Sequence, residues 1–307
     1  MTKPTVEERR TFLKSVGALG LTVALPRFGS AADATILKVI PSTGERLPAI
    51  GMGSWITFNV RNETARDVRV EVLKEFFARG GSLVDSSPMY GRSEQVIGYC
   101  LERLGTDSLF SATKVWIFGK NFGIGQMNSS QDLWGVDRFD LMQIHNMLDW
   151  QKHLRTLEEW KGQGRIRYIG ITTSHGRRHR QMERVIAEQD AFDFVQFTYN
   201  IADREAEQRL LPMAAEHGKA VIINRPFRGG GLFRSVQGKP LPDWASEIGC
   251  ENWAQFFLKF VVSHPAVTCA IPATSRVDHM QENIGALYGR LPDPDTRERM
   301  ARYYERV

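Results

Sequence analysis

Eight apolar runs of strand length recur along the chain, and segments with helical periodicity separate them. The helical patterns are clearest at residues 65–80, 150–164 and 204–218, and one more helix is expected after the last run. Such alternation indicates a parallel sheet, because each helix returns the chain to the same end of the next strand. Eight units that close on themselves form a (β/α)8, or TIM, barrel. We therefore predict an α/β barrel with strands within residues 49–55, 82–87, 109–116, 139–145, 167–174, 194–200, 220–227 and 267–273.

A short segment before the first strand predicts an additional β-hairpin. Residues 35–49 hold two short strand-like stretches on either side of Thr43-Gly44, a pair typical of a turn. We expect this hairpin to close the floor of the barrel. No linker or low-complexity tract interrupts the later sequence, so residues 35–307 are predicted to form one barrel domain.

Composition narrows the classes of function. The 307 residues are 42% hydrophobic and 24% charged, which is ordinary for a globular protein. The formal net charge of +5 is spread over mixed charges without a dense basic run, so a nucleic-acid partner is not expected. No apolar run approaches the ~20 residues that span a bilayer, so stable membrane insertion is not expected. Three widely spaced cysteines indicate neither a disulfide framework nor a metal site.

The first 34 residues have a different character from the rest. Arg9-Arg10 precede Phe12, Leu13 and Lys14, and a moderately apolar stretch follows at residues 16–25. Small residues then occupy positions 30, 31, 32 and 34. This order resembles a bacterial twin-arginine export signal, and the alternative is a basic amphipathic start to an ordinary helix. The resemblance implies a signal peptide over residues 1–34, the twin-arginine translocase as a partner, and a periplasmic location. A signal that does not function would leave the protein cytoplasmic.

Residues 83–94 place an aspartate at the end of a strand and a tyrosine in the loop beyond it. Asp85 ends the apolar run, Ser86-Ser87-Pro88 form the exit from the strand, and Tyr90 follows. Ser93 is expected to cap the next helix. Taken alone, Asp85 would cap a loop and Tyr90 would pack on the surface.

Other strands also end in polar residues. A lysine inside an apolar strand is costly unless a carboxylate pairs with it, so Lys114 is expected to pair with Asp85 one strand away. His145 ends the next strand in the same way, and Gln196 and Arg225 end later strands. Each could be structural by itself. Because active sites of such barrels lie at the carboxyl ends of the strands, the residues together predict a catalytic site.

These residues resemble the catalytic tetrad of the aldo-keto reductase superfamily. The motif Asp85-x4-Tyr90-Gly91-x-Ser93-Glu94 precedes Lys114 and His145, and residues 49–55, 168–174 and 271–284 add further likeness. The resemblance implies NAD(P)H-dependent reduction of an aldehyde or ketone to an alcohol, or the reverse. Tyr90 is then the general acid, Asp85 fixes Lys114, and His145 orients the carbonyl. An ammonium lowers the pKa of a nearby phenol, so Lys114 is expected to tune Tyr90 in that direction.

The same resemblance implies a set of cofactor contacts. NADP is the expected cofactor, with NAD as the alternative, because His279 and Ala273 stand where many relatives carry basic residues. Arg228 and residues 229–231 are expected near the pyrophosphate, unless these glycines are simply a flexible loop. Thr172-Thr173 replace a common Ser-Asn pair, and Arg225 or Phe227 replaces a stacking aromatic residue. The implied contacts are Gly53, Ser54, Trp55, Thr172, Thr173, Gln196, Arg225, Phe227, Thr274, Ser275, Arg276, Glu282 and Asn283.

Two other functions remain open at this stage. One is a non-catalytic nicotinamide-binding subunit, similar to the potassium-channel β-subunit branch of the superfamily. The other is a lyase or isomerase that uses Lys114 as a Schiff-base amine. The sequence does not identify the small-molecule carbonyl or alcohol substrate and predicts only an apolar mouth, formed by Trp55, Trp116, Ile117, Phe118, Met147 and Trp150.

Overall fold

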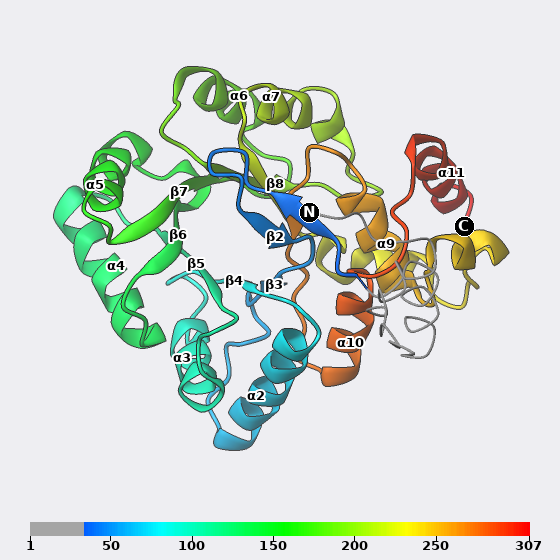
Figure 1. Cartoon of the computed structure of the whole chain (residues 1–307), viewed down its shortest axis with the longest axis horizontal. Helices are drawn as coiled ribbons and strands as arrows, with labels where there is room; N and C mark the ends of the chain where they lie inside the picture. The colour runs from blue at the N-terminus through cyan, green and yellow to red at the C-terminus, as the bar shows by residue number, and fades with distance from the viewer. Residues whose placement is uncertain (1–33) are drawn as a thin grey trace, which may run out of the picture.

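The computed structural model describes residues 34–307, so the predicted export signal lies outside the described residues except for Ala34. Eight parallel strands form one sheet in the order β10-β9-β8-β7-β6-β5-β4-β3 (Figure 1). Parallel bridges from Ile50 to Ala270 and from Gly53 to Ala273 join its two edges and close the ring. The predicted (β/α)8 barrel is confirmed. Its strands are β3 (Met52–Gly53), β4 (Leu83–Asp85), β5 (Phe110–Val115), β6 (Phe139–Ile144), β7 (Ile166–Thr172), β8 (Phe194–Thr198), β9 (Ala220–Asn224) and β10 (Cys269–Ala270).

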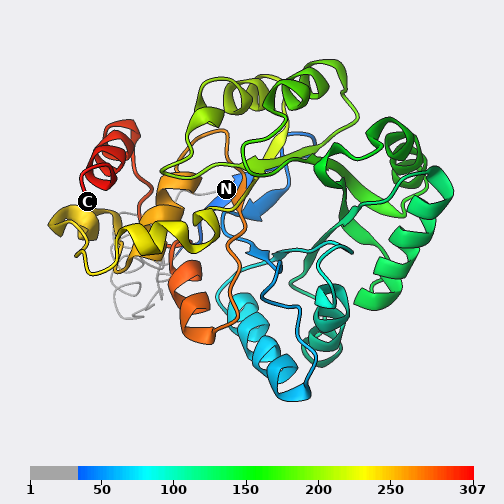
Figure 2. The same cartoon turned by 180° about the vertical axis from the view of Figure 1, so that it is seen from behind.

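Helices surround the barrel and follow the strands in turn (Figures 1 and 2). One predicted helix, at residues 204–218, is divided into the 3-10 turn η2 (Glu205–Glu207) and α7 (Leu210–Glu216). Pro212 explains the division, because proline is tolerated in the first turn of a helix and not in its interior. The other helices are α2 (Glu63–Ala78), α3 (Ser93–Leu104), α4 (Lys120–Trp134), α5 (Trp150–Gly162), α6 (His179–Glu188), α8 (Gly231–Ser235), α9 (Trp253–Val262), α10 (Val277–Gly285) and α11 (Pro294–Tyr304); further 3-10 turns are η1 (His145–Met147), η3 (Arg228–Gly230) and η4 (Asp243–Ile248). Among residues 34–307, no helix is both long and apolar enough to cross a membrane.

The predicted hairpin lies across the floor of the barrel. Strands β1 (Leu37–Val39) and β2 (Arg46–Pro48) pair antiparallel, and Figure 1 shows them in front of the ring. Ile40 and Leu47 are buried against inward-facing barrel residues such as Phe110. Glu45 forms an ion pair with Arg167 of β7, so both apolar and charged contacts hold the hairpin in place.

Helix α3 begins differently from the expectation. Its N-cap is Arg92, and Ser93 is already the first helical residue. The Ser93 hydroxyl donates to the Ser54 carbonyl at 3.4 Å and is 3.2 Å from the Ser86 hydroxyl. The expectation of a Ser93 cap was wrong, because a buried hydroxyl at this position meets partners on other loops rather than the free N–H groups of its own helix.

Candidate active site

The polar site residues lie directly above the apolar interior of the barrel. In β4, Leu83 faces the interior and Asp85, two residues later, continues the same row. The same step leads from Phe194 to Gln196 in β8 and from Ala112 to Lys114 in β5. Because side chains along a strand alternate between its faces, the carboxyl ends of several strands place polar groups in one layer.

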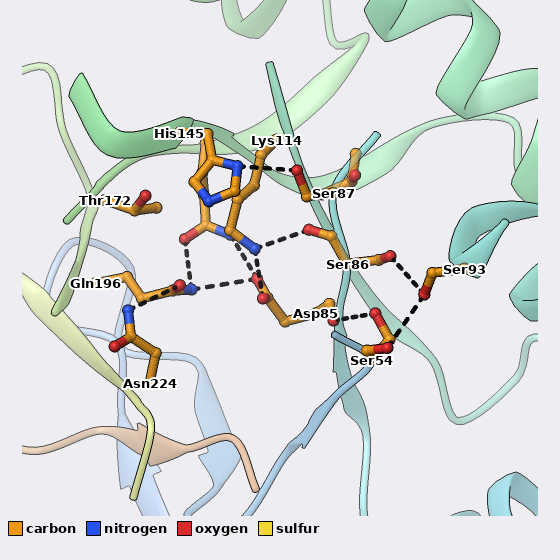
Figure 3. A network of polar contacts seen from close by, with 12 residues as sticks. Ser54, Asp85, Ser86, Ser87, Ser93, Lys114, His145, Thr172, Gln196 and Asn224 are labelled. Atoms are coloured by element: carbon orange, nitrogen blue, oxygen red, sulfur yellow. Dashed lines mark hydrogen bonds and ion pairs between the residues drawn. The ribbon is translucent and has the colours of Figure 1, made fainter. Parts of the chain in front are cut away.

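Asp85 and Lys114 form the buried centre of this layer. The Lys114 ammonium donates to Oδ2 of Asp85 and, at 2.7 Å, to the carbonyl oxygen of Ser86 (Figure 3). Lys114 has no exposed side-chain surface and Asp85 has 3%. Burial lowers the pKa of Lys114, and the Asp85 carboxylate opposes that change. The predicted pairing is confirmed.

Two amide side chains complete the surroundings of Asp85. Nε2 of Gln143 donates to Oδ1 of Asp85 at 2.7 Å. Nε2 of Gln196 reaches the same oxygen at 3.2 Å (Figure 3). Gln196 in turn accepts from the Asn224 amide at 3.4 Å. Gln143 was not among the expected site residues, although it lies in β6 two positions before His145, the spacing that puts strand side chains on one face. A carboxylate with this many donors is held in one orientation.

Tyr90 lies near Lys114, but among the described residues no hydrogen bond joins the two side chains. The Lys114 nitrogen lies 5.5 Å from the centre of the Tyr90 ring. Burial raises the pKa of Tyr90, and the Asp85 carboxylate raises it further. The expected net lowering by Lys114 is therefore wrong in this structure: the ammonium is paired with Asp85, so the pair presents little net positive charge to the phenol.

His145 follows β6 and stands beside Tyr90. The two rings meet edge to face, with centres 5.8 Å apart. Nδ1 of His145 lies 2.9 Å from the Ser87 hydroxyl oxygen. Burial, with a smaller contribution from Lys114, lowers the pKa of His145 to about 2. The imidazole is therefore neutral at physiological pH, and it can donate one hydrogen bond without carrying charge.

One cavity of about 390 Å³ joins these groups at the carboxyl ends of the strands. Asp85, Tyr90 and His145 line it, whereas Lys114 is buried beneath them. The Thr173 hydroxyl donates to the Arg177 carbonyl, and the Asn224 amide donates to the Thr173 carbonyl. Of the residues expected to contact cofactor, the cavity is lined by Gly53, Ser54, Trp55, Thr172, Thr173, Gln196, Arg225 and Phe227.

The remaining expected cofactor residues follow β10 and do not line this cavity. They continue from Ala273 at its edge into the start of α10. The Arg276 guanidinium donates from Nε to Asp278 at 2.9 Å, and the backbone N–H of Arg276 donates to the Thr274 hydroxyl at 3.2 Å. None of these five residues lines the cavity that Asp85, Tyr90 and His145 line: Thr274, Ser275, Arg276, Glu282 and Asn283.

The mouth of the cavity is apolar, but the residues that form it differ from those expected. Trp55 and Ile56 line the cavity with 46% and 63% of their surfaces exposed. Ile56 has a φ of 64°, an unusual value for a β-branched residue and typical of a constrained functional loop. Of the six residues expected there, only Trp55 lines the cavity; five do not: Trp116, Ile117, Phe118, Met147 and Trp150.

Comparisons with known proteins agree with this fold. The sequence pattern of the Aldo/keto reductase family matches residues 49–300. The NADH-specific methylglyoxal reductase of Escherichia coli is 23% identical, over 84% of this chain and 96% of its own. The pyridoxine 4-dehydrogenase of the same organism is 26% identical, over 72% of this chain and 82% of its own. Among solved structures, an aldo/keto reductase from Klebsiella pneumoniae in complex with NADP and acetate superposes with a TM-score of 0.74, at 24% identity over 85% of this chain and 93% of that one.

Proposed function

The chain belongs to the aldo/keto reductase family, and from that premise we propose that it uses NAD(P)H to reduce an aldehyde or ketone to an alcohol, or catalyses the reverse reaction. The observation that carries the proposal is the site itself. Tyr90 and His145 face one cavity, and the buried Asp85–Lys114 pair lies directly beneath them.

Each residue has a distinct part in the proposed chemistry. Tyr90 keeps its proton at neutral pH, so it is available to protonate the carbonyl oxygen as negative charge develops there. Lys114, 5.5 Å from the centre of the Tyr90 ring, is the cation nearest to the phenolate that proton transfer would leave, and Asp85 holds it in place. His145 donates a hydrogen bond to the substrate oxygen and fixes its position.

The cavity fits a nicotinamide cofactor. Gln196 and Asn224 present amide groups beside the tetrad, and amides of this kind suit the carboxamide of a nicotinamide. Gly229 and Gly230 line the same cavity, and because glycine has no side chain, the backbone there can approach a bulky phosphate closely. A reduced nicotinamide supplies the hydride when bound. Ser54, Thr172, Thr173, Arg225 and Phe227 are the further residues that we propose to hold it.

We propose NADP rather than NAD as the preferred cofactor. Arg276 lies at the start of α10, where a guanidinium and free N–H groups suit a 2′-phosphate. Asp278 competes for this arginine through an exposed ion pair. The relatives differ too, since one is named NADH-specific and the Klebsiella enzyme was solved with NADP.

Turnover of a panel of carbonyl compounds tests the proposal. We expect consumption of NADPH with at least one aldehyde or ketone, and an increase in rate with substrate concentration. A protein that binds NADPH and turns over no carbonyl or alcohol would match the non-catalytic subunit instead. Borohydride trapping of a substrate on Lys114 would indicate Schiff-base chemistry and exclude the proposed role of that lysine.

We also propose that residues 1–34 direct export through the twin-arginine route, on the strength of Arg9-Arg10 and the apolar stretch after them. That route carries folded proteins, so the chain would bind NADP before export and carry it to the periplasm. Changing Arg9 and Arg10 together to lysine should keep a signal-bearing fusion in the cytoplasm. Unimpaired export would contradict the targeting proposal, and nucleotide-free periplasmic protein would contradict export with cofactor.

A further inference from the structure

We propose that Ser87 is a positioning residue for the reaction: its hydroxyl donates a hydrogen bond to Nδ1 of His145 and thereby holds the imidazole proton on Nε2. The inference rests on the proposed function, because it concerns how His145 meets the substrate oxygen. Ser87 lies in the loop after β4, and His145 opens the turn after β6 (Figure 3).

The contact between Ser87 and His145 is short and shielded from water. The Ser87 oxygen is 2.9 Å from Nδ1, and the exposed fractions of the two residues are 1% and 5%. A histidine ring pivots about two side-chain bonds, so one fixed contact at Nδ1 restricts the direction in which Nε2 points. His145 lines the cavity, which is where the carbonyl oxygen is expected.

The direction of this hydrogen bond follows from the other partner of Ser87. The backbone N–H of Met89 donates to the Ser87 oxygen at 3.4 Å, so that oxygen already accepts one bond. If Nδ1 also carried a proton, Ser87 would accept twice and its own proton would have no acceptor among the described residues. A buried donor without a partner is unfavourable. Donation from Ser87 to Nδ1 gives the Ser87 proton an acceptor and leaves the Ser87 oxygen to accept from Met89.

The consequence concerns the chemistry of His145. A neutral imidazole has one N–H, and a hydrogen bond accepted at Nδ1 places it on Nε2. Burial and Lys114 keep the ring neutral by lowering its pKa to about 2. Nε2 then donates to a carbonyl oxygen in the cavity. The opposite tautomer would turn a lone pair towards that oxygen and repel it.

Nitrogen-15 NMR of the histidine rings tests this assignment without turnover. His145→Asn identifies the His145 signals. In the unmodified protein we expect Nε2 protonated and Nδ1 unprotonated. Ser87→Ala should give a mixture of tautomers and lower kcat/KM about tenfold, the size of one net hydrogen bond. Ser87→Thr retains the hydroxyl and should restore both properties. Ser93→Ala removes a neighbouring buried hydroxyl that does not contact His145, so it should leave the His145 signals unchanged.

The outcomes separate this inference from the proposed function. A proton on Nδ1 in the unmodified protein, or an unchanged tautomer in Ser87→Ala, overturns the role of Ser87 even if carbonyl compounds are reduced. The expected tautomers in a protein that turns over no carbonyl or alcohol support the assignment and contradict the reductase function instead. Thermal unfolding of each variant shows that the comparison is made on folded protein.

Discussion

Tyr90 holds its proton more tightly in this site than an exposed tyrosine does. Burial and the Asp85 carboxylate both disfavour the phenolate, and the Lys114 ammonium is already paired with that carboxylate. A proton donor of this kind acts when charge develops on the substrate oxygen, rather than by being partly ionised beforehand. Tyr90 therefore suits reduction, in which it gives up its proton. The charges around it must then stabilise the phenolate that remains.

Tyr90→Phe tests the donor directly. The variant loses one hydroxyl and keeps the ring, including its edge-to-face contact with His145. We expect turnover to fall at least about 10²-fold, the lower end for loss of a general acid, while the fold is retained. Steady-state kinetics with the best carbonyl substrate measures the effect, and circular dichroism checks the fold. Near-normal reduction by the variant would exclude Tyr90 as the proton donor.

His145 should make the stability of the protein depend on pH. Its folded pKa of about 2 is below the ordinary value of 6.5, so the unfolded chain binds more protons between these limits. The stabilising contribution is present above pH 6.5 and is lost as the pH falls towards the folded pKa. The slope reaches about 1.4 kcal/mol per pH unit for one proton.

Urea unfolding of the unmodified protein and of His145→Gln at several pH values measures this contribution. The variant should show a shallower decrease in stability between about pH 3 and 6. His264→Gln is the matched control, because burial lowers the pKa of His264 to about 4 and its contribution should disappear over a narrower range. Parallel curves for His145→Gln and the unmodified protein would show that the ring is not held neutral.

At the scale of elements, the hairpin at the floor of the barrel and the loops at its opposite end have different roles. Ile40 and Leu47 complete the apolar interior from below, and the catalytic layer lies at the other ends of the same strands. Conformations with positive φ occur after the strands at Ile56, Asn146, His175 and Arg225, all of which line the cavity. Stability and chemistry are thus assigned to opposite ends of the barrel.

Two neighbouring residues of the hairpin test this division. Ile40 is fully buried and Val39 is 51% exposed. Ile40→Ala should lower the free energy of unfolding by about 2–5 kcal/mol, because it leaves a void in the interior. Val39→Ala should change it by less than about 0.5 kcal/mol, as expected at an exposed position. Both should retain the kcat of the unmodified protein at temperatures where they are folded, and a large loss of kcat in either would contradict the separation.

At the scale of the whole molecule, the cavity and the region after β10 lie next to each other on one face, although they come from segments across the entire chain. Pro272 and Ala273 line the cavity, and Arg276 precedes α10 directly beyond them. A dinucleotide is long enough to contact both parts, so its binding would link strands from the two halves of the sequence. A ligand that binds only the folded state stabilises it by mass action.

Thermal unfolding with each nucleotide tests this link and the cofactor preference. A concentration of NADP about 100 times its Kd should add about 2.7 kcal/mol of stability. Arg276→Ala should weaken the effect of NADP and leave that of NAD unchanged, because only NADP carries the 2′-phosphate. Gln281→Ala, at an exposed position of α10 that is not expected to contact the cofactor, is the control for a general effect of the substitution. Equal or greater stabilisation by NAD in the unmodified protein would contradict the NADP preference.

The sequence by itself determined the order of strands and helices, the hairpin and the pairing of Asp85 with Lys114. Apolar periodicity and the cost of an unpaired buried lysine are local and pairwise properties that can be inferred without coordinates. Only the tertiary structure showed the hydrogen bonds of Gln143 to Asp85 and of Ser87 to His145. It also showed that the pKa of Tyr90 is raised rather than lowered. Those features depend on distances across strands and on how completely water is excluded. A hydrogen bond or a pKa depends on all the groups that surround a side chain in space, and the linear order of residues does not specify which groups those are.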